Sequence, residues 1–183
     1  MSGGVAATAR VHAPRVEADG AVRAVAVASV LLAAVAHVWV IPEHLAEWLP
    51  AAVFFVVVSA GQVALAWRLR RSPSGPVLAA GLLGTIGLVV FYVMTRTVDL
   101  PFLPAAHAEH LPTAWGIGNG IPIFPGDRME EVGVPDLVCL AAELVTIGAL
   151  CALATPVVRR TVTSGLLALG VAMLVLRLVG PLG

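Results

Sequence analysis

The sequence predicts an all-α protein, built as a helical bundle in a membrane. Its 183 residues are 59% hydrophobic and only 12% charged, and the mean hydropathy is +0.96. A soluble domain carries about a quarter charged residues, so this chain lacks the polar side chains needed to cover itself in water. The lipid bilayer is therefore its first expected partner. The formal net charge is zero, which gives no reason to expect nucleic acid as a partner.

Five apolar runs predict five transmembrane helices, each near the ~20 residues that cross a ~30 Å hydrocarbon core. They cover residues 24–41, 51–67, 77–95, 137–155 and 162–179. Pro42 is expected to end the first helix, because proline breaks the backbone hydrogen-bond pattern. Glycines in the second and third runs predict close packing between helices. These glycines are Gly61, Gly81, Gly84 and Gly87.

The arginines predict the orientation, because cytoplasmic connections carry an excess of positive charge. They precede the first run and fill alternate connections at Arg10, Arg15, Arg23, Arg68, Arg70, Arg71, Arg159 and Arg160. The pattern predicts a multi-pass plasma-membrane protein with its N-terminus inside and its C-terminus outside. Residues 1–22 are expected to form a flexible cytoplasmic tail. Residues 23–183 are expected to form one transmembrane bundle, with a long extracytoplasmic loop at about 97–135.

Two other interpretations concern the first and fourth runs. Residues 34–36 have the A-x-A shape of a signal-peptidase site, but the apolar run continues to Ile41 and is long enough to span. Cys139 and Cys151 lie twelve residues apart in the fourth run, which is about 18 Å along a helix. A disulfide needs Cα atoms within about 7 Å, so these cysteines are not expected to pair within one chain.

Ionisable side chains concentrate on the predicted outer side, and Glu143 is the sharpest case. It lies seven residues into the fourth run, about 10 Å below the outer boundary. A lipid-facing carboxylate at that depth is costly, so Glu143 is expected to face the bundle interior. Asp136 lies two turns above it on nearly the same face. His37 lies about 6 Å below the end of the first run.

These groups predict an outward-facing cavity lined by histidines and carboxylates that binds a transition metal. The expected ligands are His37, His44, Glu47, Glu131, Asp136 and Glu143. Imidazole and carboxylate suit zinc, iron or copper, so ligand type leaves the metal open. The segment HAEH can add His107, Glu109 and His110. Other polar residues expected in the bundle are Gln62, Tyr92, Arg96 and Arg177.

Two further classes of function stay open at this point, and the sequence does not decide whether the protein is an enzyme. Intramembrane carboxylates and histidines also mark proton relays, so a proton- or solute-coupled transport component is one alternative. Five spans without a detectable repeat would then require a homo-oligomer. The other alternative is a non-enzymatic subunit or assembly factor of a larger membrane complex. In that case Glu143 would form a structural ion pair with Arg177 or His37.

Several short segments resemble a group of uncharacterised actinobacterial multi-pass membrane proteins. The segments are AHVWVIPEHLAEW, FFVVVSAGQVALA, TRTVDLPF and EVGVPDLVCLAAE. The similar residues are His37, Pro42, Glu43, His44, Glu47, Gln62, Arg96, Glu131, Gly133, Asp136 and Glu143. The resemblance covers the first four runs and part of the outer loop. It implies membership of that group and no particular chemistry.

Overall fold

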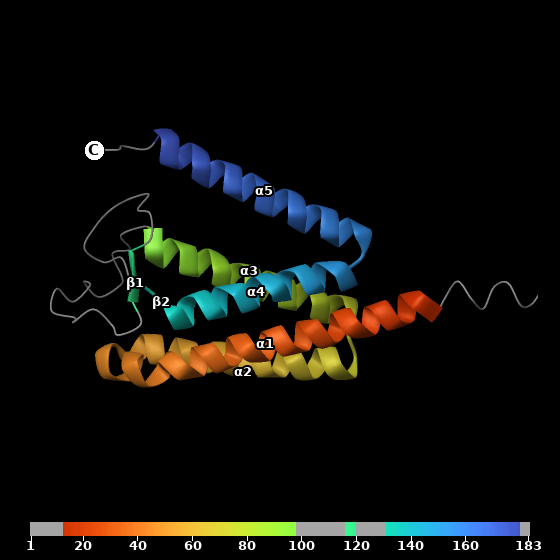
Figure 1. The fold of residues 1–183 in the computed structure, drawn as a ribbon, viewed down its shortest axis with the longest axis horizontal. Coiled ribbons are helices and arrows are strands. Elements are labelled where there is room, and N and C mark those ends of the chain that lie inside the picture. The colour runs from red at the N-terminus through yellow and green to blue at the C-terminus, as the bar shows by residue number, and fades with distance from the viewer. Residues whose placement is uncertain (1–12, 98–115, 120–130, 180–183) are drawn as a thin grey trace, which may run out of the picture.

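The computed structural model describes residues 13–97, 116–119 and 131–179, and helices dominate them (Figure 1). The helices are α1 (Ala13–Glu47), α2 (Leu49–Arg71), α3 (Gly75–Thr97), α4 (Val134–Leu153) and α5 (Pro156–Val179). Two short strands, β1 (Gly116–Asn119) and β2 (Glu131–Gly133), pair antiparallel. The predicted helical bundle is confirmed, with this small strand pair added to it.

Helices α1 to α4 are each long and apolar enough to cross a membrane. Side chains on their outer surfaces are apolar as well, since Val35 is 62% exposed, Trp39 73% and Leu83 72%. A large exposed apolar surface on a bundle is expected where lipid is the solvent. Helix α5 is 24 residues long but is not among the four. Figure 1 shows it (blue) turning back from the end of α4 along the bundle.

Helices α1 and α2 form a hairpin joined by a single residue, Trp48. The Trp48 N–H donates to the carbonyl oxygen of His44 at 2.8 Å. The predicted end of the first helix at Pro42 is wrong, because α1 continues through it to Glu47. Proline in a membrane helix removes one backbone hydrogen bond, a loss that packing by neighbouring helices offsets. Here the turn after Pro42 packs on α2, where the rings of His44 and Phe55 lie 4.7 Å apart.

Helix α1 packs against both α2 and α4, and α4 also packs against α3 (Figure 1). Buried alanines on α1, such as Ala26 and Ala33, let the neighbouring backbones approach closely. Leu69, Leu82 and Leu150 fill the core at 0–1% exposure. Among the described side chains, those of α5 that join this core lie in its first half, at Val158, Val162 and Leu166.

Close packing by glycine is confirmed at Gly81 alone. A Cβ atom at Gly81 would lie 3.0 Å from Leu65 and 3.1 Å from Leu150. At Gly61, Gly84 and Gly87 a Cβ atom would meet nothing within 4 Å, so the prediction is wrong for these three. The reason is that α2 and α3 touch each other only slightly. They leave a groove between them, whose lining includes Gly61 and Gly84.

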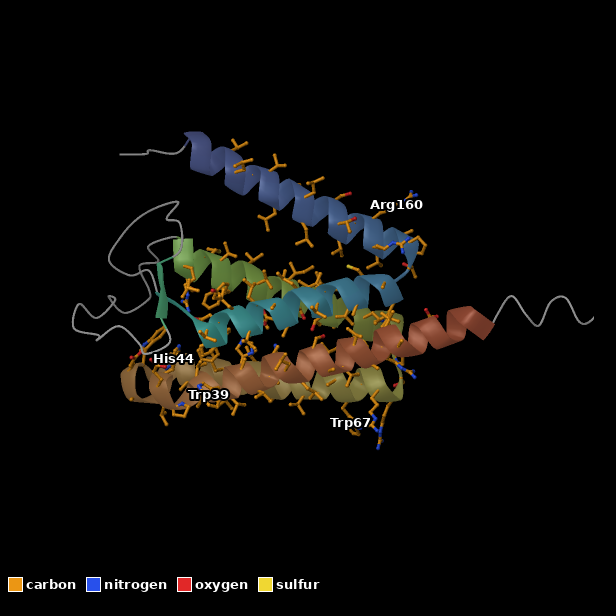
Figure 2. The ribbon with its side chains drawn as sticks, in the orientation of Figure 1. Trp39, His44, Trp67 and Arg160 are labelled. Carbon is orange, nitrogen blue, oxygen red and sulfur yellow. The ribbon has the colours of Figure 1, made fainter. Side chains whose placement is uncertain are left out.

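The two ends of the bundle differ in charge. We call one the arginine end, where α2 finishes with Arg68, Arg70 and Arg71 and α5 begins near Arg159 and Arg160. We call the other the strand end, where α1 ends and α4 begins beside β2. Figure 2 shows Trp67 and Arg160 at the arginine end and His44 at the strand end.

Candidate metal centre

Polar side chains form a stripe along the face of α4 that packs on α1. Asp136, Cys139, Glu143 and Thr146 follow one another at intervals of three or four residues, which places them on one face of a helix. A side-chain hydrogen bond holds the first turn of α4. Asp136 Oδ2 accepts a hydrogen bond from the Gly133 backbone N–H at 2.7 Å, and an acidic residue there suits the positive end of the helix dipole.

His37 of α1 meets this stripe at two points. Its Nε2 atom lies 3.4 Å from Cys139 Sγ and 3.9 Å from Glu143 Oε1. One nitrogen, one sulfur and one oxygen atom of these three residues all lie within 4.8 Å of one another. His37 is 8% exposed and Glu143 is 3% exposed. We call His37, Cys139 and Glu143 the ligand cluster.

Gln62 of α2 holds the ligand cluster from the other side. Its Oε1 atom lies 3.0 Å from His37 Nδ1. An amide oxygen only accepts hydrogen bonds, so Nδ1 carries the proton and donates, and Nε2 keeps its lone pair facing Cys139 and Glu143. The Gln62 amide nitrogen donates to Glu143 Oε1 at 3.4 Å. Gln62 thus fixes both the tautomer and the orientation of His37, as partners of metal-binding histidines do.

The spacing of the ligand cluster suits tetrahedral coordination. With Zn–N near 2.0 Å and Zn–S near 2.3 Å, a tetrahedral angle places the two ligand atoms about 3.5 Å apart. The His37–Cys139 distance is 3.4 Å, and the His37–Glu143 distance is 3.9 Å. The two distances that involve Nε2 are thus close to those of a tetrahedral site, and all three ligand atoms lie within 4.8 Å of one another. Three protein ligands leave a fourth position for water or a substrate.

The ligand cluster lines a cavity of about 240 Å³ between α1, α2, α3 and α4. Much of the rest of the wall is aromatic: Trp48, Phe54, Phe55, Phe91 and Tyr92 all line it. The imidazole of His37 stacks on Phe55, with ring centroids 5.5 Å apart. His44 lines the same cavity one level nearer the strand end.

An ion pair borders the cavity toward the strand end. Arg96 Nη2 lies 3.1 Å from Asp136 Oδ1, and both side chains line the cavity. The Arg96 guanidinium also lies over the Tyr92 ring, 5.1 Å from its centroid. Because Asp136 bonds Arg96 with one oxygen and the Gly133 N–H with the other, it links α3 to the start of α4.

Toward the arginine end the polar stripe stops. Thr146 Oγ1 and Ser29 Oγ lie 2.8 Å apart, which joins α4 to α1 one turn below Glu143. Beyond them the interface is apolar, with Ala26 and Leu150 both at 0% exposure. In the described part of the chain, the polar side chains between α1 and α4 therefore extend from the strand end to Ser29 and Thr146 and stop there.

The structure brings together some of the residues predicted as ligands. Glu143 faces inward, as predicted, and it meets His37 beside Gln62. His44 and Asp136 line the cavity, as do Tyr92 and Arg96, but neither His44 nor Asp136 joins the ligand cluster. Glu47 is exposed at the end of α1. The side chains of Glu131 and Arg177, and all of the HAEH segment, lie outside the described residues.

The sequence analysis did not predict Cys139 as a ligand and considered it only in ruling out a disulfide with Cys151. The signal was present in the spacing. Cys139 lies three residues after Asp136 and four before Glu143, so it shares the helix face that was already assigned to those two acids.

Comparison with protein-family models, with curated proteins and with solved structures finds no match for this chain. The resemblance to actinobacterial membrane proteins stays a prediction. What the protein does must therefore be argued from the geometry of its own residues.

Proposed function

We propose that this chain is a multi-pass membrane protein whose ligand cluster binds one transition-metal ion. A single observation carries the proposal. A buried imidazole, a buried carboxylate and a half-buried thiol, from two helices, present ligand atoms within 4.8 Å of one another. Burying such groups together is costly unless a partner compensates them. A divalent cation bound to a thiolate, a carboxylate and a neutral imidazole gives a site with no net charge.

Zinc is the metal that this ligand set suits best. Thiolate, imidazole and carboxylate are all regular zinc ligands, and three protein ligands with an open fourth position are typical of sites that act on a substrate or water. A thiolate disfavours magnesium and calcium, which take oxygen ligands. Iron and copper, also expected from the sequence, are the competing metals in the test below.

The test is the metal content of the purified full-length protein. We expect one zinc ion per chain after reconstitution and dialysis, measured by plasma mass spectrometry against protein concentration. Cys139→Ser is expected to lose this zinc. Cys151→Ser is the matched control, because Cys151 lies on the same helix and is 8% exposed, yet it is not part of the ligand cluster. Failure of wild-type protein to retain zinc, iron or copper would rule the proposal out. So would a Cys139→Ser variant that retains as much metal as Cys151→Ser.

The membrane arrangement is part of the same proposal. We place the arginine end in the cytoplasm, the strand end outside, and α5 as a fifth span in the plasma membrane. The positive-inside rule supports this, because the arginine end holds the basic residues of two connections. Exposed apolar residues on α5, such as Leu167 and Leu174, support the fifth span. Labelling of single cysteines added at each terminus, from outside intact cells, tests it: only the C-terminal cysteine is expected to react.

The ligand cluster is proposed as a binding site approached from one side. Between α1 and α4 the polar stripe stops one turn past Glu143, and Ala26 and Leu150 bury the interface beyond it. A transport path along this interface would need polar groups or water beyond that level. The α1–α4 interface therefore fits metal binding from the outer side better than proton- or solute-coupled transport.

A further inference from the structure

The cavity beside the ligand cluster adjoins the groove between α2 and α3, and Leu88 lines both. The groove has a volume of about 440 Å³ and runs toward the arginine end as far as Arg68. Its walls are mostly small or aliphatic, with Gly61 and Ala64 on α2 and Ala80 and Gly84 on α3. The two neighbouring spaces offer an aromatic part, the cavity, and an apolar part, the groove.

The cavity is larger than a bound metal ion requires. A liquid water molecule takes up about 30 Å³, whereas the cavity measures about 240 Å³. An ion with one bound water would leave most of this space for a second ligand. The surrounding rings contact one another in a row, with Phe54 5.3 Å from Phe55 and 5.4 Å from Phe91. Such a row of aromatic faces and edges favours a planar ring as the second ligand.

One polar atom of a residue beside the cavity also requires a partner. His44 Nδ1 is buried and has no hydrogen-bond partner among the described residues. A buried imidazole nitrogen without a partner is unfavourable, and a ligand oxygen in the cavity would satisfy it as an acceptor. The ligand therefore needs both a planar ring and an oxygen acceptor on that ring.

The route into the cavity from outside the bundle passes between α2 and α3. Phe91 of α3 lines the cavity and is 36% exposed. Because α2 and α3 touch only slightly, the Phe54 and Phe91 rings are the contact between them at this level. At the depth of a membrane span, a ligand entering there comes from the lipid.

We infer that the cavity and groove together bind a quinone with an apolar tail. The ring lies in the cavity against Phe54 and Phe55, with one ring oxygen accepting a hydrogen bond from His44 Nδ1. The tail lies in the groove across Gly61 and Gly84. This binding goes beyond the metal site, because the proposed hydrogen-bond donor His44 and the groove lie outside the ligand cluster, which shares only the cavity wall with the ring.

The test uses full-length protein in lipid nanodiscs and decylubiquinone as the probe. Trp48 lines the cavity, so a background variant with Trp39, Trp67 and Trp115 changed to Phe leaves it as the only tryptophan. Decylubiquinone is expected to quench Trp48 fluorescence saturably. Duroquinone, which has the ring without the tail, is expected to bind at least about tenfold more weakly, because the methylenes of the tail are no longer buried.

Two glycine-to-leucine substitutions test whether the quinone tail lies in the groove. Gly84→Leu fills the groove, and its Cβ meets no other atom within 4 Å, so the fold is expected to remain intact. It should weaken decylubiquinone binding by about tenfold or more, by displacing buried methylenes, while leaving duroquinone unchanged. Gly87→Leu is the matched control, since Gly87 is equally open but lines neither space. If Gly84→Leu aggregates, Gly61→Leu fills the same groove from α2.

Three results would overturn the inference: no saturable quenching, equal affinities for decylubiquinone and duroquinone, or no difference between Gly84→Leu and Gly87→Leu. Displacement of the quinone by decanol at equal concentration would also overturn it, because the site would then recognise any apolar chain. Repeating the titration on metal-depleted wild-type protein separates the two proposals. Quinone binding is expected to persist there, whether or not the metal proposal survives.

Discussion

The Sγ atom of Cys139 lies 3.4 Å from Nε2 of His37, although 102 residues separate them in the chain. The contact arises because α1 and α4 pack side by side, with the face of α1 that carries His37 against the face of α4 that carries Cys139. Glu143, one turn further along α4, adds a carboxylate 3.9 Å from the same nitrogen. A His/carboxylate prediction thereby becomes a His/Cys/carboxylate site, whose softer sulfur ligand favours zinc over the oxygen-seeking cations.

The stability effect of Glu143→Gln is expected to depend on zinc. Without metal the substitution should be neutral or stabilising, because it removes a buried carboxyl group while the amide oxygen still accepts from Gln62. With zinc the wild type should gain about 2.7 kcal/mol at a free zinc concentration of 100 Kd, and the variant far less. Thermal unfolding in detergent, with and without zinc, measures both. Equal stabilisation of the two proteins by zinc would contradict the assignment of Glu143 as a ligand.

Replacing Gln62 with leucine is expected to weaken zinc binding by about 10–100-fold without changing the stoichiometry, because losing the hydrogen-bond partner of a ligating histidine frees its tautomer and ring orientation. Competition against a chromophoric chelator measures the affinity. Ser59→Ala is the control on the same helix, since the Ser59 hydroxyl bonds only to the Phe55 carbonyl oxygen among the contacts described. An unchanged affinity in Gln62→Leu would show that Gln62 does not position His37.

Because Arg96 and Asp136 form an ion pair, the effects of substituting them on the stability of the protein are expected to be non-additive. The Arg96 and Asp136 side chains are 11% and 25% exposed, and their closest atoms are 3.1 Å apart. Arg96→Gln and Asp136→Asn should each lower the melting temperature, because each leaves the other charge poorly paired. The double variant should be less destabilised than the sum, by about 0.5–3 kcal/mol. Strict additivity would mean that the pair contributes nothing to stability.

Substitution by alanine at two glycines of α3 is expected to change the stability of the protein in opposite directions. Gly81→Ala should destabilise the protein by about 1–3 kcal/mol, the usual range for overpacking, because its Cβ would lie 3.0 Å from Leu65. Gly87→Ala should stabilise it by up to about 1 kcal/mol through helix propensity, because no atom lies within 4 Å of the new Cβ. Thermal unfolding of both variants in one detergent tests the difference. A stable Gly81→Ala would show that α3 packs less tightly on Leu65 of α2 and Leu150 of α4 than described.

The inward orientation of Glu143 could be predicted because it follows from solvation alone. A carboxylate in the middle of an apolar run is costly if it faces lipid, so its side chain is expected to point toward other polar groups in the bundle. The same argument predicted that His37 would lie close to the outer boundary, and it identified Gln62, Tyr92 and Arg96 as bundle residues. The partner of each was not predictable, because many rotations and heights of five helices bury the same residues equally well.

The course of the chain at Pro42 and the role of Cys139 show where local rules fail. Proline normally ends a helix, but packing of the next turn on Phe55 keeps α1 helical to Glu47. A cysteine in a sequence does not reveal its role until the residues that surround it in space are known. Its spacing from Asp136 and Glu143 gave the helix face, and only the position of His37 made that face a binding surface.

The sequence by itself determined that the chain forms apolar helices, which polar residues interrupt near one end. This follows because hydropathy and helix periodicity are properties of neighbouring residues. The tertiary structure decided which helices touch, and so which atoms share a site. It placed His37 between Cys139 and Gln62, paired Asp136 with Arg96, and left α2 and α3 apart with a groove between them. Those outcomes depend on the fit of side chains across helix interfaces, which no single segment of sequence contains.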